Sequence, residues 1–469
     1  MLLNTAQRQQ SDSLSAAEQD TEEQPSRSLS PLPSASPDAA TATTLSSSSS
    51  STVKVPRGTF VYASAPARID LCGGWTDTIP ITHEHGGRVV NVAVNINNKA
   101  PYTVRARRTE ALILSLSYDV KVPAEHYHSL EQLRDYADPT VPCALLKASI
   151  VASGILGITG TRHDEDKISE LAPSHPPLRT MAELLKRAGG GLELEVRSSL
   201  PVGSGMGTSS ILAAAILAVL KILMGEPYTM EDLVYLTLDV EQMMNTGGGW
   251  QDQVGGIYPG FKVGTCRLGL PIKIHTTQIE VADTFLDEFD ARLVLIYTGQ
   301  TRLAKNLLQT VLMNWTSQDP KIVETMDRLV QDAEQCEQAL RKGKFDSVGT
   351  LLSRYFSDKR LLSRTTLHHP PSVGRLLQHL DPYIEGASLA GAGGGGFLVA
   401  ILRPGLDRDS VLSTVRKAMK QEDLECSEAV DQERSTHQVE EDADVPGGMW
   451  SWKASIARTG LVVSVGHEC

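Results

Sequence analysis

A glycine-rich stretch, Pro201-Val-Gly-Ser-Gly-Met-Gly-Thr-Ser-Ser210, lies between a predicted strand and a predicted helix. Glycines let a backbone approach a phosphate, and the first turn of a helix offers unpaired N–H groups and the positive end of its dipole. The stretch lacks the Lys of a P-loop, and Thr208 stands where a dinucleotide-binding fingerprint has its third Gly. A tight strand–helix turn is the structural alternative. The paired hydroxyls of Thr208 and Ser209 favour a phosphate with its metal.

Two further stretches combine glycines with groups that can do chemistry. The first, Ala65-Pro-Ala-Arg-Ile-Asp-Leu-Cys-Gly-Gly-Trp-Thr-Asp77, holds a cation, Arg68, and a carboxylate, Asp77. The second, Gly391-Ala-Gly-Gly-Gly-Gly-Phe397, lies between two predicted strands. A fixed cation can keep a neighbouring carboxylate ionised and stabilise charge that moves during phosphoryl transfer. A surface ion pair is the ordinary alternative for Arg68.

The three stretches, in their order along residues 60–400, resemble the three motifs of the GHMP kinases, the superfamily of galactokinase and mevalonate kinase. The family's motifs are an Ala-Pro-x-Arg/Lys segment, a Pro-x-x-x-Gly-x-Gly-[Ser/Thr]-Ser segment before an apolar helix, and a C-terminal glycine run. Within the superfamily, the first motif and Tyr297-Thr-Gly-Gln-Thr-Arg302 look most like the kinase domain of L-fucokinase. The resemblance implies a two-lobed α+β GHMP kinase fold and phosphoryl transfer from ATP to a sugar.

The resemblance also implies which residues carry the reaction. ATP and its phosphates are expected at Gly203, Ser204, Gly205, Met206, Gly207, Thr208, Ser209 and Ser210. Mg²⁺ is expected on Ser209 and Glu241, which suits an ion that takes one or two carboxylates and shares phosphate oxygens. Asp252 corresponds to the family's general base, and Arg68 to the basic residue beside it. Without the resemblance, Glu241 would be interpreted as part of a solvated helix face.

Substrate contacts are expected, again by resemblance, from Asp77, Trp75, Gly393 and Gly394. Galactokinase carries a Glu-His pair where this chain has Gly74-Trp75, and that pair handles the C6 hydroxyl of the sugar. An apolar Trp in that place suits a 6-deoxy sugar such as fucose. The alternative is that Trp75 belongs to the core.

These residues together predict an ATP- and Mg²⁺-dependent kinase that phosphorylates the anomeric hydroxyl of L-fucose to L-fucose 1-phosphate, a salvage step towards GDP-fucose. A heptose-phosphate kinase is the first alternative, because its first motif also reads Gly-Gly-x-Thr-Asp. A non-catalytic, sugar-sensing homologue is the second, although a sensor has no need of the base, its cation and both metal ligands. The sequence leaves open the sugar, the anomer, the adenine pocket and the oligomeric state.

The elements that position these residues follow from apolar periodicity. Strands are predicted at Val89–Ile96, Tyr102–Ala106, Leu112–Ser117, 192–197, Leu293–Tyr297, on both sides of the glycine run within Leu389–Leu402, and at Ser455–Val465. Helices are predicted from about Ser209, from Thr229 to about Asn245, at Asp319–Arg341 and at Phe345–Leu352. We divide this α+β chain into an N-terminal ATP-binding domain at 59–262 and a C-terminal domain at 263–469.

Two segments are predicted to be disordered. Residues 1–58 contain no aromatic side chain, and 14 of the first 51 residues are Ser, so this tail cannot bury enough apolar surface to fold. An acidic insertion is predicted at about 422–447, with ten acidic residues against Arg434 within 422–444. Residues 1–55 and 422–444 together account for the formal charge of −12. The rest of the chain is close to neutral and offers no basic face for nucleic acid.

Composition restricts the remaining possibilities. No apolar run reaches the roughly 20 residues of a membrane span, and the first ten residues lack the apolar region of a secretory signal. The six Cys are scattered without a C-x-x-C pair, so neither zinc nor a disulfide framework is indicated. We expect a cytoplasmic protein with a small-molecule sugar as its partner. Many fucokinases carry a large N-terminal lobe, so this chain is either a free-standing kinase or a fragment.

Overall fold

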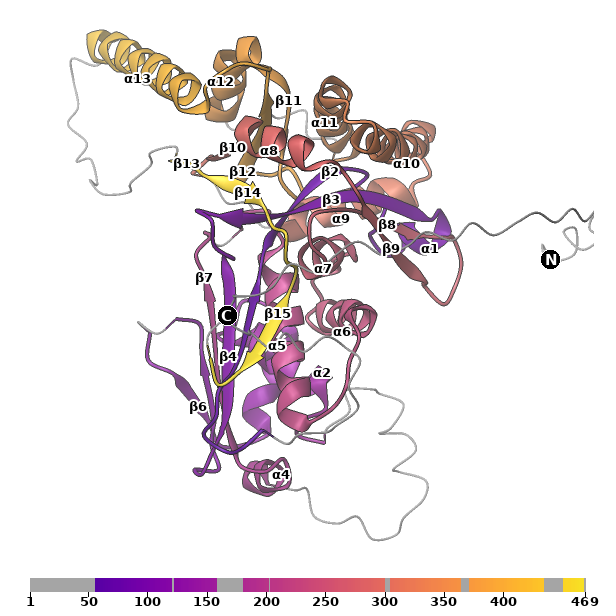
Figure 1. The fold of residues 1–469 in the computed structure, drawn as a ribbon, viewed down its shortest axis with the longest axis vertical. Helices are drawn as coiled ribbons and strands as arrows, with labels where there is room; N and C mark the ends of the chain where they lie inside the picture. The colour runs from indigo at the N-terminus through magenta and orange to yellow at the C-terminus, as the bar shows by residue number, and fades with distance from the viewer. Residues whose placement is uncertain are drawn as a thin grey trace, which may run out of the picture. The chain divides into compact units, whose positions relative to one another are not determined.

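The computed structural model describes residues 55–119, 122–157, 180–201, 203–299, 304–363, 371–433 and 450–467 (Figure 1). The predicted Ser-rich tail up to residue 54 lies outside the described residues, as do residues 434–449 of the predicted acidic insertion and Arg302. Within the described residues, no helix is both long and apolar enough to cross a membrane.

A six-stranded sheet contains the first strand of the chain and one of the last. Its order is β15 (Val462–Val465), β1 (Val61–Ala65), β4 (Tyr102–Thr109), β7 (Gly191–Ser198), β5 (Leu114–Ser117) and β6 (Glu125–Tyr127). Neighbouring strands are antiparallel except for β5 and β7, which are parallel. Buried and partly exposed residues alternate along β1 and β4, so one face of the sheet is in the core.

Helix α5 (Thr208–Met224) packs on this sheet and is almost wholly buried, because its sequence is apolar on nearly every side (Figure 1). Helices α2 (Ala144–Ser153), α6 (Met230–Met243) and α7 (Gln251–Ile257) pack around it. Gly207 precedes α5 and Gly225 follows it, each in the left-handed region at φ +79° and +73°. The enclosed helix therefore fixes the position of the glycine-rich stretch at its N-terminus.

A second sheet holds the Arg68 motif. Strand β2 (Ala67–Cys72) pairs antiparallel with β3 (Gly87–Ile96), which lies in the order β14 (Ala454–Ile456), β3, β8 (Phe261–Cys266) and β9 (Ile274–Ile279). All six residues of β2 are buried. Arg68 and Asp70 are two residues apart on this strand, so their side chains leave it on the same face.

The third sheet has the order β11 (Ile384–Leu389), β12 (Phe397–Leu402), β10 (Leu293–Tyr297) and β13 (Trp450–Trp452). Helix α11 (Phe345–Leu362) packs on β11 and on α10 (Pro320–Arg341), and both helices also contact β2. Helices α12 (Pro371–Leu380) and α13 (Arg408–Glu433) pack against each other and share a hydrophobic cluster with this sheet.

The remaining described helices are α1 (Ile81–Glu84), η1 (Glu131–Ala137), α4 (Met181–Arg187), α8 (Asp283–Arg292), α9 (Ala304–Thr316) and η2 (Asp381–Tyr383).

The segment 450–467 contributes one strand to each sheet. Strand β13 pairs with β10, β14 pairs with β3, and β15 pairs with β1. All the described residues belong to one compact unit, in which β2 contacts α10 and α11 across the predicted domain boundary. The division at 262/263 stays a prediction.

The predicted α+β class and most predicted elements are confirmed. The helix expected from Thr229 is α6, and Thr229 and Asp232 cap it reciprocally through side chain and backbone. The predicted helix at Phe345–Leu352 continues to Leu362. Helix α13 runs to Glu433, into the segment for which a loop was predicted from 422. Its sequence there has four Glu together with Leu424, Ala429 and Gln432, and these helix-forming residues outweigh the clustered charge.

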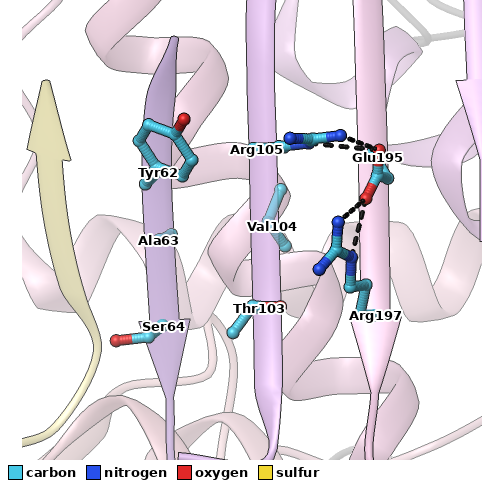
Figure 2. A pocket seen from close by; sticks show the side chains of 8 residues that line it. All are labelled: Tyr62, Ala63, Ser64, Thr103, Val104, Arg105, Glu195 and Arg197. Atoms are coloured by element: carbon cyan, nitrogen blue, oxygen red, sulfur yellow. Dashed lines mark hydrogen bonds and ion pairs between the residues drawn. The ribbon is translucent and has the colours of Figure 1, made fainter. Parts of the chain in front are cut away.

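A shallow recess on the six-stranded sheet contains none of the predicted site residues. It is lined by Tyr62, Ala63, Ser64, Thr103, Val104, Arg105, Glu195 and Arg197 (Figure 2). Glu195 pairs with both arginines, Arg105 at 2.6 Å and Arg197 at 2.7 Å. Both arginines of the recess are therefore already paired with Glu195, and the predicted chemistry lies elsewhere.

Close packing of α11 on β11 gives a test of the fold. A Cβ atom on Gly386 would lie 1.9 Å from the carbonyl oxygen of Gly349, so Gly386→Ala forces the helix away from the strand. We expect this variant to lose about 1–3 kcal/mol of stability, as overpacked cores do. Thermal unfolding measures the loss. Gly374→Ala in α12 is the matched control, because its new methyl group meets no neighbouring element and Ala favours helices by up to about 1 kcal/mol. Equal melting temperatures for the two variants would contradict the packing described here.

Candidate active site

Arg68 lies at the centre of the candidate site, with 2% of its surface exposed. Its Nε donates to Asp252 Oδ1 at 2.8 Å, and Nη2 donates to the same oxygen. Its Nη1 donates to Asp70 Oδ1 at 2.8 Å and to the carbonyl oxygen of Gly205 at 3.0 Å. Burial works to lower the pKa of Arg68, but the charges of Asp252 and Asp70 outweigh burial and raise it. The guanidinium is therefore a fixed cation that contacts the first two motifs and the predicted base.

Asp252 is in the first turn of α7, and the described residues bind only one of its two carboxylate oxygens. Oδ1 accepts both bonds from Arg68, whereas Oδ2 receives no hydrogen bond from the described residues. The side chain is 27% exposed. A Cβ atom on Gly207 would lie 3.5 Å from Asp252 Cβ, so the carboxylate is next to the glycine-rich stretch. This arrangement leaves one carboxylate oxygen free to accept a proton from a substrate.

Asp70 is buried and accepts four hydrogen bonds. Its Oδ1 accepts from Arg68 and from the backbone N–H of Gly391 at 3.0 Å. Its Oδ2 accepts from the Tyr355 hydroxyl at 2.6 Å and from Lys359 Nζ at 2.9 Å. Burial would raise the pKa of Asp70, but the charges of Lys359 and Arg68 lower it below its ordinary value. The carboxylate is therefore ionised inside the protein, with every acceptor position used.

The second and third glycine-rich stretches lie side by side. The backbone N–H of Phe397 donates to the carbonyl oxygen of Ser204 at 3.1 Å. A Cβ atom on Gly396 would lie 2.3 Å from that oxygen, and one on Gly205 would lie 2.6 Å from the carbonyl oxygen of Ala390. Side chains at these glycines would separate the two loops, which explains why both stretches consist largely of Gly.

The hydroxyls of the second stretch point in different directions. Thr208 Oγ1 is hydrogen-bonded to the Tyr102 hydroxyl at 2.9 Å and to Ser204 Oγ at 3.2 Å. Ser209 is exposed on the first turn of α5, and Ser210 is buried. The free N–H groups of this helix start, together with the exposed hydroxyl, form a suitable cradle for phosphate oxygens.

Glu241 is buried on α6, and it contacts Ser210 instead of Ser209. Ser210 Oγ donates to Glu241 Oε1 at 2.6 Å, and the Thr246 hydroxyl donates to Oε2. Burial raises the pKa of Glu241, against the effect of these two hydrogen bonds. A bound cation would stabilise the charged form. The described residues contain no group of three or more His, Cys, Asp or Glu side chains that could hold a metal ion.

Asp77 joins the segment around Trp75 to α7. It accepts the backbone N–H of Trp75 at 3.1 Å through Oδ1 and that of Gln251 at 3.1 Å through Oδ2. Burial raises the pKa of Asp77 to about 7, with a smaller contribution from Asp252. Its two oxygens are occupied by the protein backbone, so a sugar hydroxyl would have to share them.

Trp75 is 6% exposed and belongs to the main hydrophobic core. It nevertheless lies in the left-handed region at φ +80°, which is strained for a large side chain. Its indole Nε1 is buried without a hydrogen-bond partner among the described residues. These features agree with the core alternative for Trp75, and they also leave one buried donor for which a substrate hydroxyl would be a partner.

Gly393 and Gly394 lie in the third stretch and are partly exposed. A Cβ atom on Gly393, at φ +81°, would lie 3.4 Å from Lys359 Cδ. The structure thus brings Arg68, Asp252, the second stretch and the third stretch together, and it attaches Asp77 to the same helix as Asp252. The assignment of these residues to ATP, Mg²⁺ or sugar stays a prediction.

Sequence reasoning missed Asp70, Tyr355, Lys359 and Thr246. Asp70 had a local signal, since a residue two positions from Arg68 on a strand shares its face. Tyr355 and Lys359 are four residues apart on α11 and share a helix face, but nothing in their own segment indicates a buried carboxylate 289 residues away.

A comparison with known proteins covers several of the residues that this geometry brings together. Residues 177–260, which include the glycine-rich stretch, Glu241 and Asp252, match the family described as GHMP kinases N terminal domain. The chain is similar to the GHMP kinases over these residues. Two curated relatives are 29% identical: the bifunctional fucokinase/GDP-fucose pyrophosphorylase of Arabidopsis thaliana, over 74% of this chain, and the L-fucokinase/L-fucose-1-P guanylyltransferase of Bacteroides fragilis, over 73%. The chain matches only 30% and 34% of their lengths, respectively.

Other relatives and solved structures are more distant. The D-glycero-alpha-D-manno-heptose 7-phosphate kinase of Campylobacter jejuni is 25% identical over 45% of this chain and 61% of its own length. The galactokinase of Lactococcus lactis, solved with galactose, has a TM-score of 0.54 at 18% identity, covering 86% of this chain and 95% of that one. The mevalonate kinase of Methanococcus jannaschii has a TM-score of 0.52 at 14% identity, covering 77% and 96%. These structures show that the GHMP kinase fold is shared.

The raised pKa of Asp77 predicts a pH-dependent stability. The folded protein holds the Asp77 proton up to about pH 7, whereas the unfolded chain releases it near the ordinary value of 3.8. The folded state therefore binds more protons between these values, and this contribution to stability is lost as pH rises through 7. We expect the melting temperature of Asp77→Asn, relative to wild type, to rise from pH 5 to pH 8 and then level off.

Thermal unfolding of both proteins across this pH range measures the effect. Asp77→Ser removes the same charge with a different shape and should show the same trend. A difference from wild type that is constant with pH for both variants would mean that Asp77 is already ionised when the protein is folded at pH 5.

Proposed function

We propose that this chain is a GHMP kinase that transfers the γ-phosphoryl group of ATP to the anomeric hydroxyl of L-fucose. The observation that carries the proposal is the Arg68–Asp252 pair beside the N-terminus of α5. One oxygen of Asp252 is held by the guanidinium and the other is free, at a side chain that is 27% exposed. The names of the two fucokinase relatives supply the substrate.

In the proposed reaction, the oxygen of the sugar hydroxyl attacks the γ-phosphorus, and Asp252 Oδ2 accepts the proton of that hydroxyl. The bond between sugar oxygen and phosphorus forms, the bond from that phosphorus to the β–γ bridging oxygen breaks, and ADP leaves. Arg68 orients the carboxylate and stabilises the negative charge that moves between donor and acceptor. Phosphoryl transfer requires mainly such positioning and charge stabilisation, so this small set of residues is sufficient.

The phosphates of ATP would bind at Gly203–Gly207 and at the first N–H groups of α5. Glu241 would hold Mg²⁺, and the exposed hydroxyl of Ser209 in the first turn of α5 would be the second protein ligand. The ion neutralises phosphate charge when it is bound. Because Ser210 already donates to Glu241, it would orient that carboxylate towards the metal.

Two other functions are supported less well. The similarity to a heptose 7-phosphate kinase favours a phosphorylated sugar as the alternative substrate, but it extends over only 45% of this chain. A sugar sensor without turnover would have no use for the buried charges that hold Asp252, since these are costly to bury unless they serve a site.

Asp252→Asn tests the proposed base. We expect turnover with L-fucose to fall by about 10²–10⁴-fold, the usual contribution of a positioned acid or base. Binding of a fluorescent ATP analogue should be unchanged, because Asp252 does not belong to the phosphate cradle. A melting curve like that of the wild type shows that the variant is folded. Wild-type turnover in the variant would exclude a catalytic role for Asp252.

Glu241→Gln is the companion variant and should raise the Mg²⁺ concentration needed for half-maximal rate. The amide keeps the shape and one acceptor oxygen but loses the charge that attracts a divalent ion. Rate is measured against MgCl₂ concentration at fixed ATP. Superimposable curves for wild type and variant would contradict the metal assignment.

A panel of sugars tests the substrate. ADP release should be fastest with L-fucose, and kcat/KM for L-galactose, which adds a hydroxyl at C6, should be lower by about 10²-fold, because an apolar pocket rejects an added hydroxyl only weakly. Turnover with a heptose 7-phosphate and none with L-fucose would favour the alternative kinase. Sugar binding without ADP release from any member of the panel would favour the sensor.

A further inference from the structure

The mechanism above gives no role to Lys359, although this residue is only 2% exposed and carries a full set of contacts. Its Nζ donates to Asp70 Oδ2 at 2.9 Å and to the carbonyl oxygen of Leu389 at 2.8 Å. The ammonium group also lies 3.9 Å from the centre of the Tyr355 ring. A lysine is seldom buried unless it is paired, so these contacts call for an explanation.

The two hydrogen bonds of Lys359 lead to two parts of the candidate site. The bond to Asp70 leads to Arg68, which donates to the opposite oxygen of the same carboxylate and, in turn, to Asp252. The bond to Leu389 holds the last residue of β11, two positions before Gly391, and Gly391 N–H itself donates to Asp70 at 3.0 Å. Lys359 therefore contacts both the support of the catalytic pair and the start of the third glycine-rich stretch.

We propose that Lys359 is a positioning residue. Through Asp70, it holds the Arg68–Asp252 pair and the 391–396 glycine loop in the relative positions that phosphoryl transfer requires. The inference rests on the function proposed above. Lys359 touches neither sugar nor nucleotide in this proposal. It acts through Asp70.

The charges explain why an ammonium group is needed there. Lys359, Asp70, Arg68 and Asp252 form a line of alternating charges whose sum is zero. Without Lys359, the buried carboxylate of Asp70 competes with Asp252 for the single cation left, which is Arg68. The guanidinium then moves towards the more deeply buried partner, and the bonds from Nε and Nη2 to Asp252 lengthen. A displacement of about 1 Å at a reacting group lowers rates by up to about 10²-fold.

The first test compares Lys359→Met with Asp358→Asn. We expect Lys359→Met to lower kcat by about 10–10²-fold with little change in KM for ATP, because the phosphate cradle is not altered. Asp358 is the preceding residue of the same helix and pairs with Arg328 at 2.6 Å, away from Asp70. Asp358→Asn should therefore keep the wild-type kcat, even if its melting temperature falls. Equal kcat values for Lys359→Met and wild type would overturn the proposal.

The double variant Asp70→Asn/Lys359→Met separates positioning from a structural contact. If Lys359 acts through Asp70, removing both charges restores the balance, and the double variant has a kcat no lower than Lys359→Met alone. If the two residues only contribute separately to packing, their effects on kcat multiply. That result would overturn the proposal. Should Lys359→Met fail to fold, Lys359→Gln keeps a donor without the charge and is measured in its place.

A last measurement does not need turnover. The Nε–H resonance of Arg68, assigned with Arg68→Lys, reports the bond to Asp252. It should shift and exchange faster with solvent in Lys359→Met and stay unchanged in Asp358→Asn. If wild type releases no ADP with any sugar, the proposed function fails, and this resonance still decides whether Lys359 positions Arg68. An unchanged resonance in Lys359→Met would exclude that role.

Discussion

The buried carboxylate of Asp70 is the constraint on which the candidate site depends. Four donors from three segments converge on its two oxygens: the guanidinium of Arg68, the hydroxyl of Tyr355, the ammonium of Lys359 and the backbone N–H of Gly391. An ionised carboxylate away from water is tolerated only with such a complete set of partners. Each partner is therefore held at a fixed distance, and strand β2, helix α11 and the third glycine loop form one rigid support.

This support restricts which residues the neighbouring glycine loops can contain. Arg68 reaches the second glycine loop through the carbonyl oxygen of Gly205, and that loop rests against Ala390 and Gly391. Backbone packs on backbone there, without room for side chains. The N-terminus of α5 consequently lies beside Asp252, and a phosphate bound at the helix start lies next to the free carboxylate oxygen. Catalytic geometry in this site follows from how closely two main chains approach each other.

Local patterns predicted the fold class and the cap of α6, because each has a signal within a few residues. Arg68, Asp252 and Glu241 were singled out by the resemblance of their motifs to a family, and their burial became visible only in the structure. The direction in which each side chain leaves α5 was harder to predict. Adjacent residues on a helix point about 100° apart, and tertiary packing turns Ser210 to Glu241 and leaves Ser209 exposed. The pairing of Lys359 with Asp70 has no local signal, since it arises only when α11 packs on β2. The extent of α13 was missed because helix-forming residues outweighed a run of like charges.

The three short strands of residues 450–467 have a consequence for synthesis. Strand β1 is complete at residue 65, but the strand that covers its outer edge, β15, ends only at residue 465. On the ribosome, this edge of the N-terminal sheet therefore stays unpaired until β15 has been synthesised, and such edges invite pairing with other chains. Contacts of this sequence separation also form slowly. In a nascent chain, β1, β3 and β10 all gain a neighbour from the same short segment, so one stretch, residues 450–467, completes hydrogen bonding at an edge of each of the three sheets.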